Sequence, residues 1–459
     1  MSDPTLWTAV DQARAIAERR LSSSELLELV AARIDSLDPS VNAVCTLDLD
    51  AARTAARRAD DLTVSGAALP PMHGLPMTVK DAIATAGMRS TGGAVALRDF
   101  VPASDATAVA RLRAAGAIVI GKTNLPEWSG DWQSFNEMFG TTNNPWDVTR
   151  TPGGSSGGAA AAVATGMTSV ELGTDIGGSV RVPSAFCGVF GHKPSFGVIP
   201  TLGYLDEPNG GTTESDVNVF GPIARGAADL DLLLDVLAGP LPAMSPAWRL
   251  ELPPAEVTSL RGLRIGVWLD DSLVPVDHEM TSVLQRAVTA AAGTGAVLVD
   301  DVRPDVDQQR AWRTSVRLIG AAVGVSDEVD RGPSHRDWLF MHRERAALRE
   351  AWARVFEAVE VMLCPVTSTV AFPHLQDGYW ADRMIEVNGE QRRYHELEAW
   401  PAIVGAAYLP STSTPVGRTS RGLPVGVQVV GPYLHDRRTI AVSRLLAEVV
   451  GGYVPPPLV

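Results

Sequence analysis

The chain of 459 residues has few cysteines, and no motif in it has the spacing of a metal site. Its three cysteines, Cys45, Cys187 and Cys364, are odd in number and far apart in the sequence. This pattern predicts free thiols in a reducing compartment rather than a disulfide framework. Neither the cysteines nor the scattered histidines are spaced like zinc ligands, so we expect no metal and no other cofactor.

The sequence also has no block of positive charge and no long apolar run. Its formal net charge is −14, and an acidic chain of this kind is a poor candidate for binding nucleic acid or an anionic membrane. No run approaches the roughly 18 apolar residues of a membrane span, and residues 1–20 lack the apolar core of a secretory signal. We therefore expect a cytoplasmic protein that binds neither nucleic acid nor a membrane.

The order of apolar segments predicts the fold class. With 45% hydrophobic and 20% charged residues, the composition is that of a globular protein. Residues 5–62 have a helical pattern, and from residue 75 onward short apolar strands alternate with helices. This alternation predicts an α/β fold in which helices cover both faces of a central mixed, largely parallel sheet. The absence of a repeat or a low-complexity linker favours a single large domain.

Three glycine-rich segments contain candidate chemistry. Residues 116–123, GAIVIGKT, fit the phosphate-loop pattern, but their middle residues read as a strand and not as a loop that could wrap a phosphate. Residues 151–158, TPGGSSGG, place Ser155 in a G-x-S-x-G pattern, which is the nucleophile elbow of α/β-hydrolases. The residues before Ser155 are turn formers and not the strand that an elbow needs. A Ser155 nucleophile and a plain glycine-rich loop both stay open at this point.

The third segment, residues 173–188, changes the interpretation of the second. In GTDIGGSVRVPSAFCG a predicted strand leads into two glycines, whose backbone N–H groups can converge on an oxyanion, and then into Ser179. A helix and a strand join Ser155 to Ser179, so both glycine turns can meet at one end of the sheet. Lys80 ends an earlier apolar segment, and a buried lysine can be neutral and act as a base. The chain can thus assemble a Ser–Ser–Lys site without histidine.

Four segments closely resemble the amidase signature family: GLPMTVKD, GKTNLPEW, TPGGSSGGAAAAVATG and LGTDIGGSVRVPSAFCGVFGHKP. The likeness extends over nearly the whole chain and weakens between residues 240 and 400. It implies a bacterial-type serine amidase that forms an acyl-enzyme. On this likeness we expect one domain over residues 1–459, with N-terminal helices at 1–65, a catalytic core at 66–235 and a variable helical layer or lid at 300–400.

The resemblance also implies roles for individual residues. Ser179 would be the acylated nucleophile, Lys80 the base, and Ser155 the proton-bridging serine, which in the family follows a cis peptide bond. The expected oxyanion hole consists of the backbone N–H groups of Ile176, Gly177, Gly178 and Ser179. The expected supports of the site are Ser156, as a helix cap and hydrogen-bond partner, with Asp175 and Arg181, and the expected substrate-binding residues are Trp128, Ser129, Trp132 and Thr174.

Several substrate classes stay open. Trp128, Trp132 and further aromatic residues up to Trp146 favour an apolar pocket. Such a pocket would suit small aryl or alkyl amides, anilides, aryl esters or carbamates, and the last of these would be a urethanase-like activity. We expect a small-molecule substrate, and a homodimer stays open.

Two alternatives come from the family itself. One branch is the glutaminase subunit of a tRNA-dependent amidotransferase, which usually has glutamine where this chain has Val182. The chain also ends at Val459 without an added partner-binding tail, so we expect a different role. An inactive binding member of the fold is the other alternative, and the intact Lys80, Ser155 and Ser179 argue against it.

Overall fold

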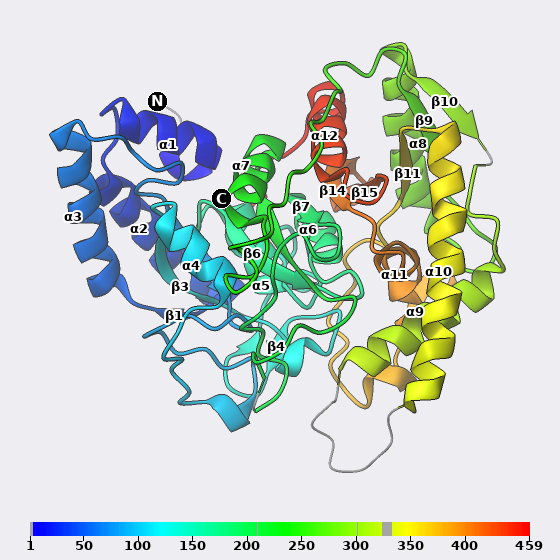
Figure 1. The fold of residues 1–459 in the computed structure, drawn as a ribbon, viewed down its shortest axis with the longest axis horizontal. Helices are drawn as coiled ribbons and strands as arrows, with labels where there is room; N and C mark the ends of the chain where they lie inside the picture. The colour runs from blue at the N-terminus through cyan, green and yellow to red at the C-terminus, as the bar shows by residue number, and fades with distance from the viewer. Residues whose placement is uncertain (1–2, 209, 301, 324–332) are drawn as a thin grey trace.

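An 11-stranded mixed sheet forms the centre of the structure, a computed structural model that describes residues 3–208, 210–300, 302–323 and 333–459 (Figure 1). The strands lie in the order β1-β3-β2-β6-β8-β7-β14-β15-β11-β9-β10. Their bounds are β1 Val44–Leu47, β2 Pro76–Lys80, β3 Ile118–Thr123, β6 Glu171–Asp175, β7 Phe190–Lys193, β8 Val219–Ala224, β9 Arg264–Val267, β10 Val297–Asp300, β11 Val361–Pro365, β14 Ser411–Arg418 and β15 Pro424–Val430.

Parallel and antiparallel pairs occupy different parts of this sheet. Strand β2 runs parallel to β3 and β6, and β9 runs parallel to β10 and β11. The strands between β6 and β11 pair antiparallel, as does β1 with β3. The predicted α/β class, with a mixed sheet in one large domain, is confirmed. The helices are α1 Ala9–Ala17, α2 Ser23–Val41, α3 Leu49–Ser65, α4 Thr107–Ala114, α5 Gly157–Thr165, α6 Arg181–Cys187, α7 Ala227–Leu237, α8 His278–Gly293, α9 Gln308–Ala322, α10 His335–Ala358, α11 Ala399–Ala406 and α12 Asp436–Val450.

Helices cover both faces of the sheet, as alternate residues of β14 demonstrate. Thr412 and Thr414 hydrogen-bond to side chains of α12, over 3.0 and 2.7 Å. Ser411 lies one position before Thr412 and hydrogen-bonds to Gln428, which also accepts a hydrogen bond from Arg181 of α6. Successive side chains of a strand point to opposite faces. Helices α12 and α6 therefore pack on opposite sides of β14.

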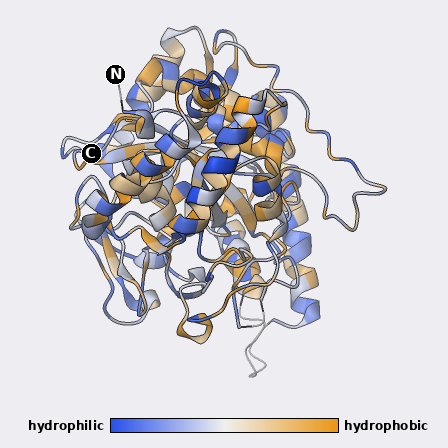
Figure 2. Cartoon of the chain, turned by 90° about the vertical axis from the view of Figure 1, so that its left-hand side faces the viewer, coloured by the Kyte–Doolittle hydropathy of each residue, from blue (hydrophilic) through white to orange (hydrophobic). Residues whose placement is uncertain are grey.

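The apolar core has two large parts. One contains buried side chains from α1 to α7, and the other contains side chains from β9, α8, α10, α11, β14 and β15. Along the helices of Figure 2, hydrophilic and hydrophobic residues alternate, as expected for helices with one face on a core. Helix α5 differs because all of its residues are buried. Its run of alanines fits this position, since only small side chains allow such close packing all around.

Two expected helical regions contain strands. Residues 5–62 were expected to be helical throughout, but β1 interrupts them and pairs with β3. Residues 300–400 hold α9 and α10, the strand β11, which the apolar run VMLCPV predicts, and an unexpected hairpin of β12 Met384–Val387 and β13 Glu390–Arg393. The division of the domain into these regions stays a prediction. The sequence analysis also missed β7, β8 and β14 in the sheet and the small β4 Phe135–Asn136 and β5 Gly140–Thr141 pair.

The segment with the phosphate-loop pattern is a strand, as predicted. Residues 118–123 form β3, and Lys122 is buried with its amine donating to the carbonyl of Ile83 and, over 2.9 Å, to the hydroxyl of Thr85. This amine is occupied within the core and cannot receive a phosphate. The cysteines Cys45, Cys187 and Cys364 are all free. Within the described ranges no helix combines the length and hydropathy needed to cross a membrane.

Candidate active site

Lys80 is the last residue of β2, and its side chain is fully buried. Its Nζ lies 2.7 Å from Ser155 Oγ and 2.7 Å from Thr174 Oγ1, within hydrogen-bonding distance of both. Burial holds the pKa of Lys80 well below its ordinary value, although the nearby carboxyl groups of Asp175 and Glu171 act in the opposite direction. Desolvation thus favours the neutral amine, which is the form that can accept a proton.

Ser155 follows a cis peptide bond from Gly154, as the resemblance predicted. The glycine-rich turn around it packs directly on neighbouring backbone. A Cβ at Gly154 would lie 2.6 Å from the backbone nitrogen of Gln133, so only glycine fits there. Ser134 Oγ donates to the carbonyls of Gly153 and Ser155, over 3.1 and 3.3 Å. The turn is therefore held by close packing and is not a flexible linker.

Ser179 stands on the turn between β6 and α6, and Asp175 braces that turn. The carboxylate of Asp175 accepts backbone N–H groups from Gly178, Val180 and Arg181, over 2.9, 3.1 and 3.3 Å. It also forms a fully buried ion pair with the Arg181 guanidinium, over 2.8 Å. Burial alone would raise the pKa of Asp175, but the charge and hydrogen bonds of Arg181 outweigh it and lower the pKa to about 2. The expected contact of Asp175 and Arg181 with this turn is confirmed.

One of the four expected oxyanion donors is already engaged. The N–H of Gly178 donates to Asp175, which corrects the expectation that it points toward a substrate. The N–H groups of Ile176, Gly177 and Ser179 have no hydrogen-bond partner among the residues that the structure describes. Gly178 has a φ of 110°, and a Cβ there would lie 2.8 Å from Pro401. Glycine is therefore needed at this position for the backbone conformation of the turn and for its close packing on Pro401.

Ser156 connects the two glycine turns. Its backbone N–H donates to the carbonyl of Ser179 over 3.1 Å, and its Oγ hydrogen-bonds to the backbone of Thr174. Its side chain does not cap α5, so that part of the prediction is wrong. A direct hydrogen bond between the hydroxyls of Ser155 and Ser179 is not among the contacts of the described residues. The structure nevertheless brings Lys80, Ser155 and Ser179 to one place.

A cavity of about 590 Å³ opens over Ser179, which is 6% exposed. Ser129, Trp128 and Trp132 line it, as expected, and the Trp132 indole N–H donates to the carbonyl of Gly177 over 3.3 Å. Thr174 is not among the described lining residues, because its hydroxyl is buried against Lys80, and its expected role in substrate binding stays a prediction. The lining residues that the sequence analysis missed are Gly130, Asp131, Tyr204, Asp206, Glu207, Pro208, Val316, Ile319, Gly320, Val323, Trp380 and Glu398. They come from loops, from α9 and from the 3-10 helices Trp380–Asp382 and Tyr394–Glu398, and they carry no motif, so no local signal could have identified them.

None of the described residues that line the cavity is a histidine. An elbow serine needs a histidine downstream of it in the sequence, but His192 lies in β7 and hydrogen-bonds to Thr412 and Asp436. His395 stacks on Trp312 instead. Ser155 contacts a lysine, and within the described part of the chain no strand leads directly into it. The geometry therefore disfavours an α/β-hydrolase elbow.

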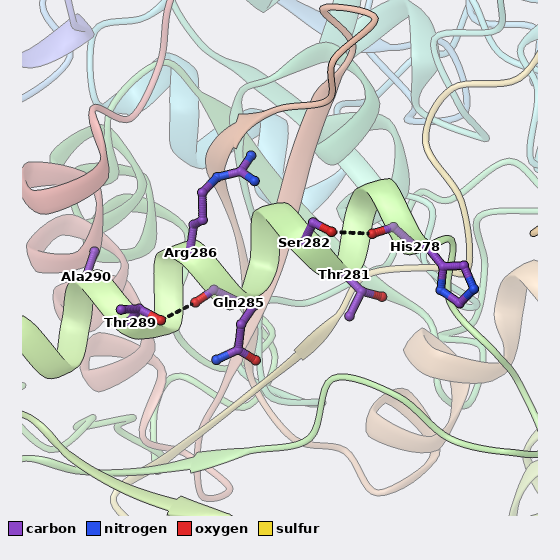
Figure 3. A pocket seen from close by; sticks show the side chains of 7 residues that line it. All are labelled: His278, Thr281, Ser282, Gln285, Arg286, Thr289 and Ala290. Carbon is purple, nitrogen blue, oxygen red and sulfur yellow. Dashed lines mark hydrogen bonds between the residues drawn. The ribbon is translucent and has the colours of Figure 1, made fainter.

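A second depression lies along the outer side of α8, and all of its lining residues belong to that one helix (Figure 3). The hydroxyls of Ser282 and Thr289 donate to carbonyls one turn earlier, those of His278 and Gln285. These two hydroxyls thus form their hydrogen bonds within the helix itself. We therefore place the candidate active site in the cavity over Ser179.

Comparison with known proteins agrees with this geometry. The family model described as Amidase matches residues 25–328 and 325–440. A glutamyl-tRNA(Gln) amidotransferase chain of Anaeromyxobacter sp. (strain K) is 32% identical over 491 aligned positions, which cover 96% of each chain. The corresponding amidotransferase chain of Roseiflexus sp. (strain RS-1) is 32% identical over 98% of each chain. The crystal structure of a bacterial aryl acylamidase of the amidase signature family superimposes with a TM-score of 0.84 and 26% identity, over 96% of both chains. Since the family model and these relatives extend over most of the chain, the protein belongs to the amidase signature family and is an enzyme that acts on amide C–N bonds.

Proposed function

We propose that this enzyme hydrolyses amides through an acyl-enzyme on Ser179. The observation that supports the proposal is the buried Lys80 amine, hydrogen-bonded to Ser155 beside the Ser179 turn. Neutral Lys80 takes a proton from Ser155, and Ser155 takes one from Ser179, whose oxygen attacks the substrate carbonyl. The oxyanion that forms is stabilised by the N–H groups of Ile176, Gly177 and Ser179. In other enzymes the loss of one such donor costs about 10²- to 10³-fold in kcat.

The second half of the reaction uses the same groups in reverse. The proton returns through Ser155 to the leaving amine, and the C–N bond breaks. A water molecule then gives a proton to the relay and attacks the acyl-enzyme, which releases the acid and restores Ser179.

The cavity lining supports small aryl or alkyl amides, anilides, aryl esters or carbamates as substrates. Rings of Trp128, Trp132 and Trp380 provide flat apolar surface above Ser179. Carbamate cleavage would use the same attack on a carbonyl carbon. A cytoplasmic location and a homodimer stay predictions.

The curated relatives favour a second candidate, because both named above belong to a glutamyl-tRNA(Gln) amidotransferase. In that role Ser179 would attack the side-chain amide of glutamine and release ammonia. The cavity gives less support to free glutamine, since none of its described lining residues carries a positive charge for the α-carboxylate.

Labelling with a fluorophosphonate, followed by mass spectrometry of the peptide, tests the nucleophile. We expect the label on Ser179 and none in Ser179→Ala. A label on Ser155 would contradict the proposal. A panel of a primary amide, an anilide, an aryl ester, an aryl carbamate and glutamine, compared by kcat/KM, separates the substrate classes. Turnover of glutamine alone would support the amidotransferase role instead.

A further inference from the structure

Glu398 is a buried carboxyl group with no partner among the residues that the structure describes. It ends the 3-10 helix η5, Tyr394–Glu398, lines the cavity over Ser179 and is 6% exposed. No hydrogen bond or ion pair joins its carboxyl to any residue that the structure describes. Burial raises its pKa to about 8. An unpaired carboxylate away from water is costly, and the cost falls when a cation or a hydrogen-bond donor arrives.

The other acidic residues that line the cavity are Asp131, Asp206 and Glu207, and Glu207 is only half-buried, so water can solvate its carboxylate. Asp131 forms an ion pair with Arg383 over 2.6 Å and accepts the Tyr394 hydroxyl over 2.5 Å. Asp206 accepts the hydroxyl of Ser215 over 3.1 Å. Among the described lining residues, Glu398 therefore has the buried carboxyl group that forms neither a hydrogen bond nor an ion pair.

The position of Glu398 brings its carboxyl group close to the turn that carries Ser179. A Cβ built on Gly177 would lie 3.6 Å from Glu398 Oε2, and Gly177 and Ser179 line the same cavity. A substrate whose carbonyl is bound at Ser179 would therefore share this cavity with the Glu398 carboxyl group.

The other residues that line the cavity are also suited to a positively charged group on the substrate. The rings of Trp128, Trp132 and Trp380 can attract a cation through their faces. Among the described lining residues there is no lysine, arginine or histidine to compete for Glu398.

We infer that Glu398 determines specificity by binding an ammonium group carried by the acyl or the amine part of the substrate. This inference rests on the proposed function, since it concerns the cavity in which Ser179 would act. It narrows the substrate class from small amides in general to amides that bear a second, protonated nitrogen.

Two matched substrate pairs test this. The 4-nitroanilides of 5-aminopentanoic and hexanoic acid differ by an ammonium in place of a methyl group on the acyl side. The acetamides of 4-(aminomethyl)aniline and 4-ethylaniline differ in the same way on the amine side. In one of the pairs we expect kcat/KM to favour the ammonium at least about tenfold, the size of one charge-assisted contact. Glu398→Gln should remove most of that preference, chiefly through KM.

The control variant is Glu396→Gln, in the same 3-10 helix. Glu396 pairs with Arg392 over 2.7 Å and does not line the cavity, so the preference should persist. Absence of preference in both pairs, or its persistence in Glu398→Gln, would overturn the inference.

A binding measurement removes the need for turnover. Hexylammonium should slow fluorophosphonate labelling of Ser179 at a concentration about tenfold or more below that of 1-hexanol, and Glu398→Gln should abolish the difference. Equal protection by both compounds, with Ser179 still labelled, would reject the role of Glu398 and leave the proposed function intact. Failure of Ser179 to label at all would reject the proposed function itself.

Discussion

The amine of Lys80 and the hydroxyl of Ser155 lie 2.7 Å apart, although 75 positions separate them in the sequence. Strand β2 brings the lysine to the end of the sheet, and the glycine turn before α5 brings the serine. Because Lys80 has no contact with solvent, its amine can exchange a proton only through hydrogen-bonded neighbours such as Ser155 and Thr174.

Replacement of Lys80 by alanine should affect amides more than activated esters. An amine leaving group needs a proton from the relay, whereas a nitrophenolate leaves without one. We expect kcat/KM for an anilide to fall by about 10³-fold, within the range of general acid–base catalysis, and that for the matching aryl ester to fall less. Steady-state kinetics on one acyl group with both leaving groups measures the ratio. An equal loss on both substrates would show that Lys80 serves only to hold the turn.

Gly178→Ala should displace the turn that carries Ser179. The new Cβ would lie 2.8 Å from Pro401 at a φ of 110°, so the backbone must move. A shift of about 1 Å at a reacting group can cost about 10²-fold, which we expect in the rate of Ser179 labelling. Gly197→Ala is the control, because it has a φ of 87° but nothing within 4 Å of the added Cβ. If both variants label at the same reduced rate, backbone strain and not the contact with Pro401 is responsible.

Asp175→Asn should destabilise the fold, because it leaves the buried charge of Arg181 without its partner. Loss of one member of a buried ion pair typically costs about 3–5 kcal/mol in the free energy of unfolding. Asp147→Asn, which breaks the more exposed pair with Arg150, should cost less than about 1 kcal/mol. Denaturant unfolding of the three proteins at neutral pH makes the comparison. Similar midpoints for the two variants would contradict the assigned weight of the Asp175–Arg181 pair.

The Asp175 carboxylate should also contribute to the stability of the fold at low pH. Its pKa is about 2 in the folded state, against an ordinary value of 3.8. A lowered folded pKa gives stabilisation that is complete above the ordinary value and is lost as pH falls through the folded one. We expect about 2 kcal/mol to disappear between these two values, and Asp175→Asn should lack this part of the acid transition.

Glu171→Gln should change how the free energy of unfolding varies at neutral and alkaline pH, in contrast to the acid effect of Asp175. Glu171 is fully buried, its carboxyl accepts the hydroxyls of Thr78 and Thr123, and burial raises its pKa from 4.5 to about 8. Its stabilising contribution is therefore complete below pH 4.5 and is lost as pH rises through about 8. The glutamine cannot titrate, so the variant should gain stability relative to the wild type between pH 5 and pH 9, approximately. Unfolding free energies measured across that range check this, and a difference independent of pH would contradict it.

Much of the fold and the reacting groups could be predicted from the sequence, because both depend on local pattern. The alternation of apolar segments predicted the α/β class, and the middle of GAIVIGKT predicted the strand that forms β3. The motif residues Lys80, Ser155 and Ser179 also lie together, since Lys80 ends β2 and the two serines lie in the turns that lead into α5 and α6. Strand β1 was missed because four residues inside a helical pattern give little periodicity.

The functions of other side chains depended on distant contacts. Thr174 lies in a motif that suggested substrate binding, yet its hydroxyl is buried against Lys80. The N–H of Gly178 has the position of an oxyanion donor in the sequence, yet Asp175 takes it. Glu398 belongs to no motif, and only the packing of η5 and α9 around the cavity brings its carboxyl to Gly177.

The sequence by itself thus determined which groups could react, because a lysine, two serines and glycine turns define that chemistry wherever they meet. Only the tertiary structure decided which backbone N–H groups are free to bind an oxyanion, how deeply Lys80 is buried and which carboxyl group lines the cavity. These properties depend on burial and on partners from remote segments, and no local sequence pattern contains either.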